Sequence, residues 1–137
     1  MKHLKQVLAF ALFMGATTFG YSQRAPLEFH NSSDCEVVIS RVYVTDCAGS
    51  DQFVYPNICI PPGNSATLPP VASPAHDWGE VVVCISQNCT PCSGVGACID
   101  QPSPFISCSS PLPPYTIEGC DCAATVEFAT PYDFVIY

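Results

Sequence analysis

The chain of 137 residues carries twelve acidic side chains against four lysines and arginines, a formal net charge of −8, and it contains ten cysteines and fourteen prolines. Nucleic-acid backbones and anionic lipid head groups repel a chain this acidic, so we expect no nucleic-acid partner. Cationic partners and divalent ions are compatible with the charge.

The first 22 residues have the pattern of a secretory signal peptide. Two lysines precede an apolar run over residues 7–16, and Gly20 and Ser22 are the small residues expected before a cleavage site at Gln23. The apolar run is shorter than the roughly 20 residues that a membrane-spanning helix needs. We therefore expect a protein secreted to the periplasm or the extracellular space, with no membrane span once residues 1–22 are removed.

The remaining chain, residues 23–137, keeps all ten cysteines, and its two arginines against twelve acids give a formal net charge of −10. Cysteine then makes up about 9% of the residues, which is typical of disulfide scaffolds in oxidising compartments. A chain of this length also buries enough surface for one hydrophobic core. These features predict a single disulfide-stabilised β domain over residues 23–137, without a cofactor.

Short β-branched and aromatic runs recur along the chain, separated by proline, glycine, asparagine and serine. The predicted strands are, in chain order, Leu27–Phe29, Glu36–Thr45, Phe53–Ile60, Ala66–Leu68, Glu80–Ser86, Phe105–Ser107, Tyr115–Glu118, Ala124–Phe128 and Tyr132–Tyr137. No segment longer than a turn or two has the apolar period of a helix. Short strands at this spacing predict an all-β fold, an antiparallel β-sandwich of the immunoglobulin-like kind.

Residues 87–114 depart from this pattern, because they contain four cysteines and at most one short strand. Loops longer than about 12–15 residues are uncommon in compact domains and are often functional. We therefore expect a protruding, disulfide-stapled loop that serves as the binding surface for an unknown extracellular partner. Asp100, Gln101 and Phe105 are its candidate exposed contacts.

All ten cysteines are expected to form disulfides. They are Cys35, Cys47, Cys59, Cys84, Cys89, Cys92, Cys98, Cys108, Cys120 and Cys122. Ten cysteines allow about 945 complete pairings, so the connectivity stays open. Five of them lie between residues 84 and 108 and five lie outside. Because five is odd, complete pairing within one chain requires at least one bridge between this middle segment and the rest.

Two other chemistries compete for the same cysteines. Cys89 and Cys92 form a C-x-x-C pair, as in a small thiol–disulfide oxidoreductase, but the residues after them make a poor helix start, and such a pair usually needs a helix N-terminus. Together with Cys120 and Cys122 the pair has the ligand set for zinc. Oxidising compartments favour disulfides over both alternatives. We therefore assign no catalytic residue and no metal ligand, and expect a protein that is not an enzyme.

Other polar motifs are less specific. His76 lies beside two acidic residues and Trp78, and we expect a surface loop that leads into a strand with Trp78 as a core anchor. Asn31 and Asn88 each begin an N-x-S/T sequon, which matters only in a eukaryotic secretory pathway. No G-x-S-x-G motif indicates a serine nucleophile.

Two runs, NSSDCEVV from Asn31 and IPPGNSATL from Ile60, resemble small secreted bacterial cysteine-rich β-sandwich proteins of uncharacterised function. The resemblance covers roughly the first half of the mature chain and implies the fold, without an activity or a functional residue. The sequence therefore predicts a secreted, non-catalytic binding or structural module of unknown specificity.

Overall fold

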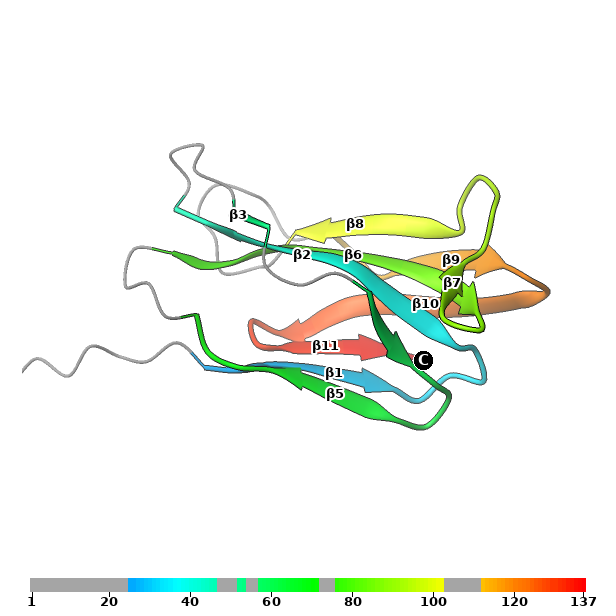
Figure 1. Ribbon diagram of the computed structural model, residues 1–137, viewed down its shortest axis with the longest axis horizontal. Coiled ribbons are helices and arrows are strands. Elements are labelled where there is room, and N and C mark those ends of the chain that lie inside the picture. Colours follow the sequence, from blue (N-terminus) through cyan, green and yellow to red (C-terminus); the bar gives the residue numbers. More distant parts are fainter. Residues whose placement is uncertain (1–24, 47–51, 54–56, 72–75, 103–111) are drawn as a thin grey trace, which may run out of the picture.

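The fold is all β within the part of the chain that the computed structural model describes. The described residues are 25–46, 52–53, 57–71, 76–102 and 112–137. They form eleven strands in two sheets and contain no helix (Figure 1). No described element is therefore a helix long and apolar enough to cross a membrane. The predicted signal peptide, residues 1–22, lies outside the described residues.

The first sheet, sheet A, has five strands. Their spatial order is β5 (Ser65–Leu68), β1 (Leu27–Asn31), β11 (Asp133–Ile136), β10 (Cys122–Thr130) and β9 (Tyr115–Gly119). Strands β1 and β11 pair in parallel, and the other pairs are antiparallel. The pairing of β1 with β11 brings together segments from opposite ends of the described chain.

The second sheet, sheet B, is centred on two long strands. Its strands are β2 (Val37–Thr45), β3 (Gln52–Phe53), β4 (Ile58–Ile60), β6 (Asp77–Gln87), β7 (Thr90–Pro91) and β8 (Cys98–Pro102). The long strands β2 and β6 pair with each other. Strands β3 and β4 also pair with β2, and strands β7 and β8 also pair with β6. All its pairs are antiparallel. The β2–β6 register shifts between Ile39 and Arg41, which lets Ile39 and Val42 both face the core although three positions separate them. Such irregularities increase the local twist, and sheet B is curled.

The inner faces of the two sheets form one core. In β1, Leu27 and Phe29 are fully buried whereas His30 is exposed, the alternation of a strand with one side against the core. Phe29 and Phe128 each contact Phe134, with ring centroids 5.9 Å and 5.0 Å apart. The predicted all-β sandwich is confirmed, with one parallel strand pair in it.

Apart from shifts of up to three residues at strand ends, the structure departs from the predicted elements in two segments. The predicted strand Phe53–Ile60 is interrupted, because β4 begins at residue 58 after Asn57, whose φ is +57°. Strands β7 and β8 occupy part of the segment predicted to be a loop. The predicted strand Phe105–Ser107 lies outside the described residues.

Four disulfides link the described cysteines. They are Cys35–Cys122, Cys59–Cys89, Cys84–Cys98 and Cys92–Cys120. The first and last join sheet B, or the residues flanking its strands, to sheet A, and the other two lie within sheet B. Among the described cysteines, two bridges, Cys59–Cys89 and Cys92–Cys120, connect residues 84–108 to the rest of the chain, which confirms the requirement for at least one. Cys47 and Cys108 lie outside the described residues. Four disulfides fit an oxidising compartment.

Two tight turns place cysteines in left-handed backbone. Asn88 and Cys89 join β6 to β7, Cys120 and Asp121 join β9 to β10, and the four φ angles lie between 48° and 61°. Two central residues with positive φ are the pattern of a type I′ hairpin turn, usually made by Asn-Gly or Asp-Gly. In the first turn, Cys89 follows Asn88 where glycine is usual. In the second turn, Cys120 precedes Asp121. Each cysteine is held in place by its disulfide.

We expect Asp121→Gly to stabilise the protein slightly. A non-glycine residue in left-handed backbone is strained, whereas glycine adopts it freely but loses more entropy on folding, which leaves a net gain of about 0.5 kcal/mol. Urea denaturation measures the change. Glu118→Gly, in the neighbouring extended strand, is the matched control and should lower stability. Equal losses for both variants would contradict this account.

Candidate functional site

The described part of the segment predicted to protrude is built into the sandwich. Strand β8 runs antiparallel along β6, with Cys98 opposite Cys84 and Gln101 opposite Val81. The backbone N–H of Glu118 in sheet A donates to the carbonyl oxygen of Gly96 at 3.0 Å. A protruding loop was therefore the wrong prediction for residues 98–102, which form a strand of sheet B.

The three predicted contact residues have different outcomes. Asp100 is exposed as predicted, whereas Gln101 is only 1% exposed, so its prediction as a surface contact is wrong. The physical reason is that neighbouring side chains of a strand point to opposite faces. Gln101 faces inward and its Nε2 donates to the carbonyl oxygen of Pro113 at 3.5 Å. Phe105 lies outside the described residues.

Asp100 lies in an open groove of about 560 Å³ on the outer face of sheet B. The groove is lined by Ser40, Arg41, Tyr43, Asn57, Glu80, Val82, Cys84, Pro91, Cys98 and Asp100. Most of these residues belong to β2, β6 and β8, where they alternate with buried ones such as Val81 and Val83. Three described residues of the segment 87–114, Pro91, Cys98 and Asp100, thus line the groove, although only Asp100 was predicted as a contact.

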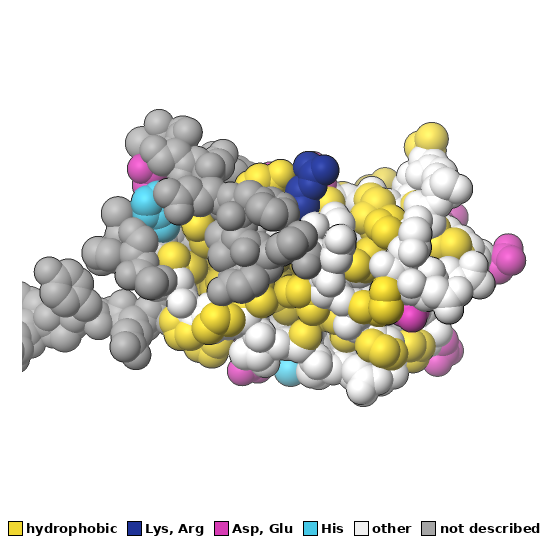
Figure 2. Space-filling model, viewed as in Figure 1, with side chains coloured by type: hydrophobic (Ala, Val, Ile, Leu, Met, Phe, Trp, Pro, Cys, Tyr) yellow, Lys and Arg dark blue, Asp and Glu magenta, His cyan; other side chains and the backbone are white. Residues whose placement is uncertain are grey.

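Among the described residues, the groove is lined by one cation and two carboxylates. Arg41 is the only lysine or arginine among the described residues, and dark blue marks cationic side-chain atoms at the surface in Figure 2. Its Nη1 donates to the Tyr43 hydroxyl at 3.4 Å, and this hydrogen bond, with a smaller contribution from Asp100, raises the pKa of Arg41. Arg41 therefore stays cationic beside Glu80 and Asp100, which also line the groove.

Two disulfides rigidify this side of sheet B. Cys84–Cys98 links the two groove-lining strands β6 and β8 directly across their register. Cys59–Cys89 ties the β6–β7 turn to β4. A groove whose walls are covalently linked keeps its shape, which lowers the entropy that a ligand must overcome on binding.

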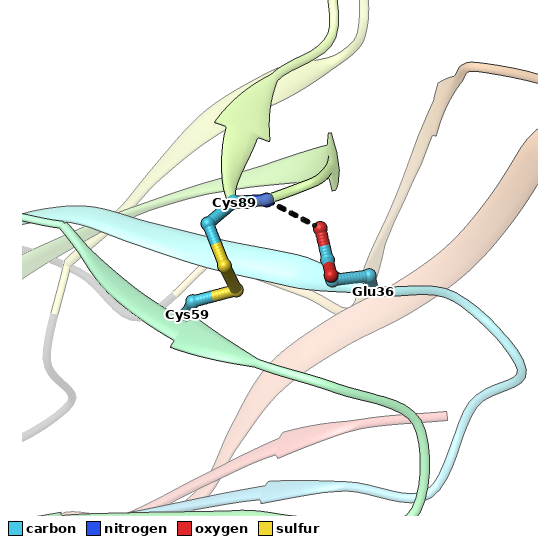
Figure 3. Close-up of side chains that lie close together, drawn as sticks. All are labelled: Glu36, Cys59 and Cys89. Atoms are coloured by element: carbon cyan, nitrogen blue, oxygen red, sulfur yellow. Dashed lines mark hydrogen bonds between the residues drawn. A yellow bond between two sulfur atoms is a disulfide. The ribbon is translucent and has the colours of Figure 1, made fainter.

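Glu36 holds the β6–β7 turn in place (Figure 3). Its Oε1 accepts hydrogen bonds from the Cys89 backbone N–H at 2.8 Å and from the Ser86 hydroxyl at 2.9 Å. Glu36, Cys59 and Cys89 lie close together, but both sulfurs belong to one disulfide and are not thiolates that a metal would bind. This cluster is structural.

The alternative cysteine chemistries do not fit the geometry. Cys89 is bonded to Cys59 and Cys92 to Cys120, so the C-x-x-C pair does not form the internal disulfide that an oxidoreductase cycles. The four cysteines weighed as an alternative zinc site are divided among three different bridges, because Cys122 is bonded to Cys35. The spacing of cysteines alone could not separate these cases.

The two sequons have different structural roles. Asn31 is 2% exposed, and its Nδ2 donates to the carbonyl oxygens of Cys35, Ile60 and Pro61, so in the folded protein this side chain is not available for a glycan. Asn88 is exposed.

Trp78 is 1% exposed, which confirms it as a core anchor, and its Nε1 donates to a backbone carbonyl oxygen.

Comparison with known proteins gives no relative from which a role can be transferred. No family model, curated protein or solved structure matches the chain. The functional argument therefore rests on the groove residues. Sequence reasoning missed Arg41, Tyr43 and Glu80, and the signal that could have found them was the outward-facing polar set of two long predicted strands.

Proposed function

We propose that the protein is a secreted, non-catalytic binding module that takes a neutral oligosaccharide in the groove on sheet B. The observation that carries the proposal is the convergence of Arg41, Tyr43 and Asp100 with other polar side chains in one open groove. The leader-like residues 1–22 and the four disulfides support secretion.

The chemistry of the groove favours a ligand rich in hydroxyl groups. Arg41 only donates hydrogen bonds, carboxylates such as Asp100 accept them, and Asn57 does both, while each sugar hydroxyl is at once donor and acceptor. A strongly charged ligand is less suited, because the described lining of the groove carries both a cation, Arg41, and two carboxylates, Glu80 and Asp100. The Tyr43 ring, Val82 and Pro91 supply apolar surface against which the C–H face of a sugar ring can pack.

The non-catalytic part of the proposal rests on the sequence, which contains no recognisable nucleophile motif. The openness of the groove also suits an extended ligand better than a reaction that must exclude water. The resemblance to small secreted β-sandwich proteins supports a binding or structural role but gives no specificity.

The proposal predicts that a panel of neutral hexasaccharides, containing cello-, malto-, xylo- and chito-oligomers, includes a ligand whose addition shifts amide NMR signals of β2, β6 and β8. Arg41→Ala should weaken that binding about tenfold or more, because a central arginine usually contributes strongly. Glu118→Gln, an exposed acid on sheet A, is the control and should bind like wild type. An absence of shifts with every oligomer, or shifts confined to sheet A, would contradict the proposal.

A further inference from the structure

The outer face of sheet A carries a second cluster of functional side chains, formed by Glu28, His30 and Asp133. Glu28 and His30 are alternate residues of β1 and therefore point to the same side, away from buried Phe29. The parallel pairing of β1 with β11 sets Asp133 directly beside Glu28. One ligand atom from each of the three lies within 4.8 Å of the other two.

Hydrogen bonds outside the cluster orient two of its three members. The Nδ1 of His30 pairs with the Ser65 hydroxyl at 3.1 Å, which leaves Nε2 directed at Glu28 Oε2, 3.3 Å away. The Thr130 hydroxyl donates to Asp133 Oδ2 at 2.5 Å. Such bonds to the far side of a histidine or a carboxylate are the usual way in which proteins fix metal ligands.

The spacing of His30 and Glu28 fits a small divalent ion. Metal–nitrogen and metal–oxygen bonds of about 2.0–2.2 Å place neighbouring ligand atoms roughly 3.0–3.4 Å apart, and the 3.3 Å between His30 and Glu28 is already in that range. The side chains of His30 and Glu28 are 46% and 43% exposed, so small rotations are free to complete the set.

We propose that Glu28, His30 and Asp133 bind a divalent transition-metal ion of the zinc type on the outer face of sheet A. The imidazole of His30 is a borderline ligand that suits Zn²⁺ and its neighbours, which also bind carboxylate oxygens, whereas Ca²⁺ and Mg²⁺ prefer oxygen ligands alone. The formal charge of the mature chain attracts a cation. The ion joins β1 to β11, and it lies on the opposite sheet from the groove and does not depend on it.

The test is calorimetric titration of the folded, disulfide-intact protein with Zn²⁺. We expect one saturable site, loss of binding in His30→Ala, and a loss of about tenfold in Ser65→Ala, which removes only the orienting hydroxyl. His30 is exposed, so its removal should leave the fold intact, and circular dichroism in chelator checks this. Bound Zn²⁺ should also raise the unfolding temperature of wild type and not of His30→Ala.

A matched pair of variants separates a site from general charge attraction. Glu28→Gln and Glu118→Gln remove the same charge from the same sheet, and only the former removes a ligand. Weakened binding in Glu28→Gln alone supports the site. The proposal would be overturned by equal weakening in both variants, by binding that persists in His30→Ala, by displacement of Zn²⁺ by equimolar Mg²⁺, or by no binding at millimolar Zn²⁺. Glu28 and His30 would then form only an ion pair.

Discussion

Replacing Asn31 by alanine should lower the free energy of unfolding by about 2–4 kcal/mol, because buried polar groups would lose their partners. Asn31 Nδ2 donates at 2.8 Å, 3.0 Å and 3.2 Å to the carbonyl oxygens of Cys35, Ile60 and Pro61. Its Oδ1 accepts from the backbone N–H and the hydroxyl of Ser33. The Asn31 side chain, which is 2% exposed, thus provides hydrogen-bond partners for backbone groups at the point where three chain segments meet.

The isosteric change Asn31→Asp should be worse, by about 3–5 kcal/mol, because it buries a carboxylate that faces carbonyl oxygens. Burial would raise the pKa of the introduced acid, so this loss is present at neutral pH and shrinks as the pH falls through the raised pKa. Asn31→Ala should show no such recovery. Urea denaturation at several pH values distinguishes the two variants.

The matched control is Asn64→Ala. Asn64 is exposed and its Nδ2 donates to one carbonyl oxygen, that of Pro62, so its removal should change stability by less than about 0.5 kcal/mol. If Asn31→Ala and Asn64→Ala were equally mild, the buried network around Asn31 would not be stabilising the fold.

The strands that were predicted correctly are those in which local pattern and burial agree. In β10, Ala124 and Val126 are buried while Ala123 is exposed and Thr125 partly exposed, the alternation that the sequence shows. Strand β8 was missed because its inward-facing residues include Gln101, a polar residue that sequence reasoning assigns to the surface. A buried glutamine hides the period of 2 on which strand prediction depends.

The grouping of residues into the two candidate sites could not be predicted, even where the single residues could, because strand register brings them together. Glu28 and Asp133 become neighbours only through the parallel pairing of β1 with β11. Arg41 and Asp100 reach one groove because β2 and β8 both pair with β6. Neither pairing leaves a local trace in the sequence, whereas the count of cysteines predicted a bridge out of residues 84–108 by parity alone.

Removing the Cys35–Cys122 bridge in a Cys35→Ser/Cys122→Ser variant should lower the free energy of unfolding by about 3–4 kcal/mol. The bridge spans 87 residues in sequence, but Cys59–Cys89 and Cys92–Cys120 shorten the loop it closes to about 30 residues. A loop of that size gives roughly 3.5 kcal/mol of chain entropy, less than the approximately 4.5 kcal/mol of an isolated long loop. Urea denaturation without reductant measures the loss.

The position of this bridge predicts a second measurable effect, a local change in hydrogen exchange, which the chain-entropy argument does not predict. Cys35 precedes β2 in sheet B and Cys122 begins β10 in sheet A, so its loss should raise hydrogen exchange in both sheets around these residues. Cys84→Ser/Cys98→Ser is the control, because that bridge joins paired strands of one sheet and its loss should affect mainly β6 and β8. A loss below about 1 kcal/mol for the first variant, or the same exchange pattern in both, would show that Cys35–Cys122 is not needed to hold the two sheets together, and that core packing and the remaining Cys92–Cys120 bridge are sufficient.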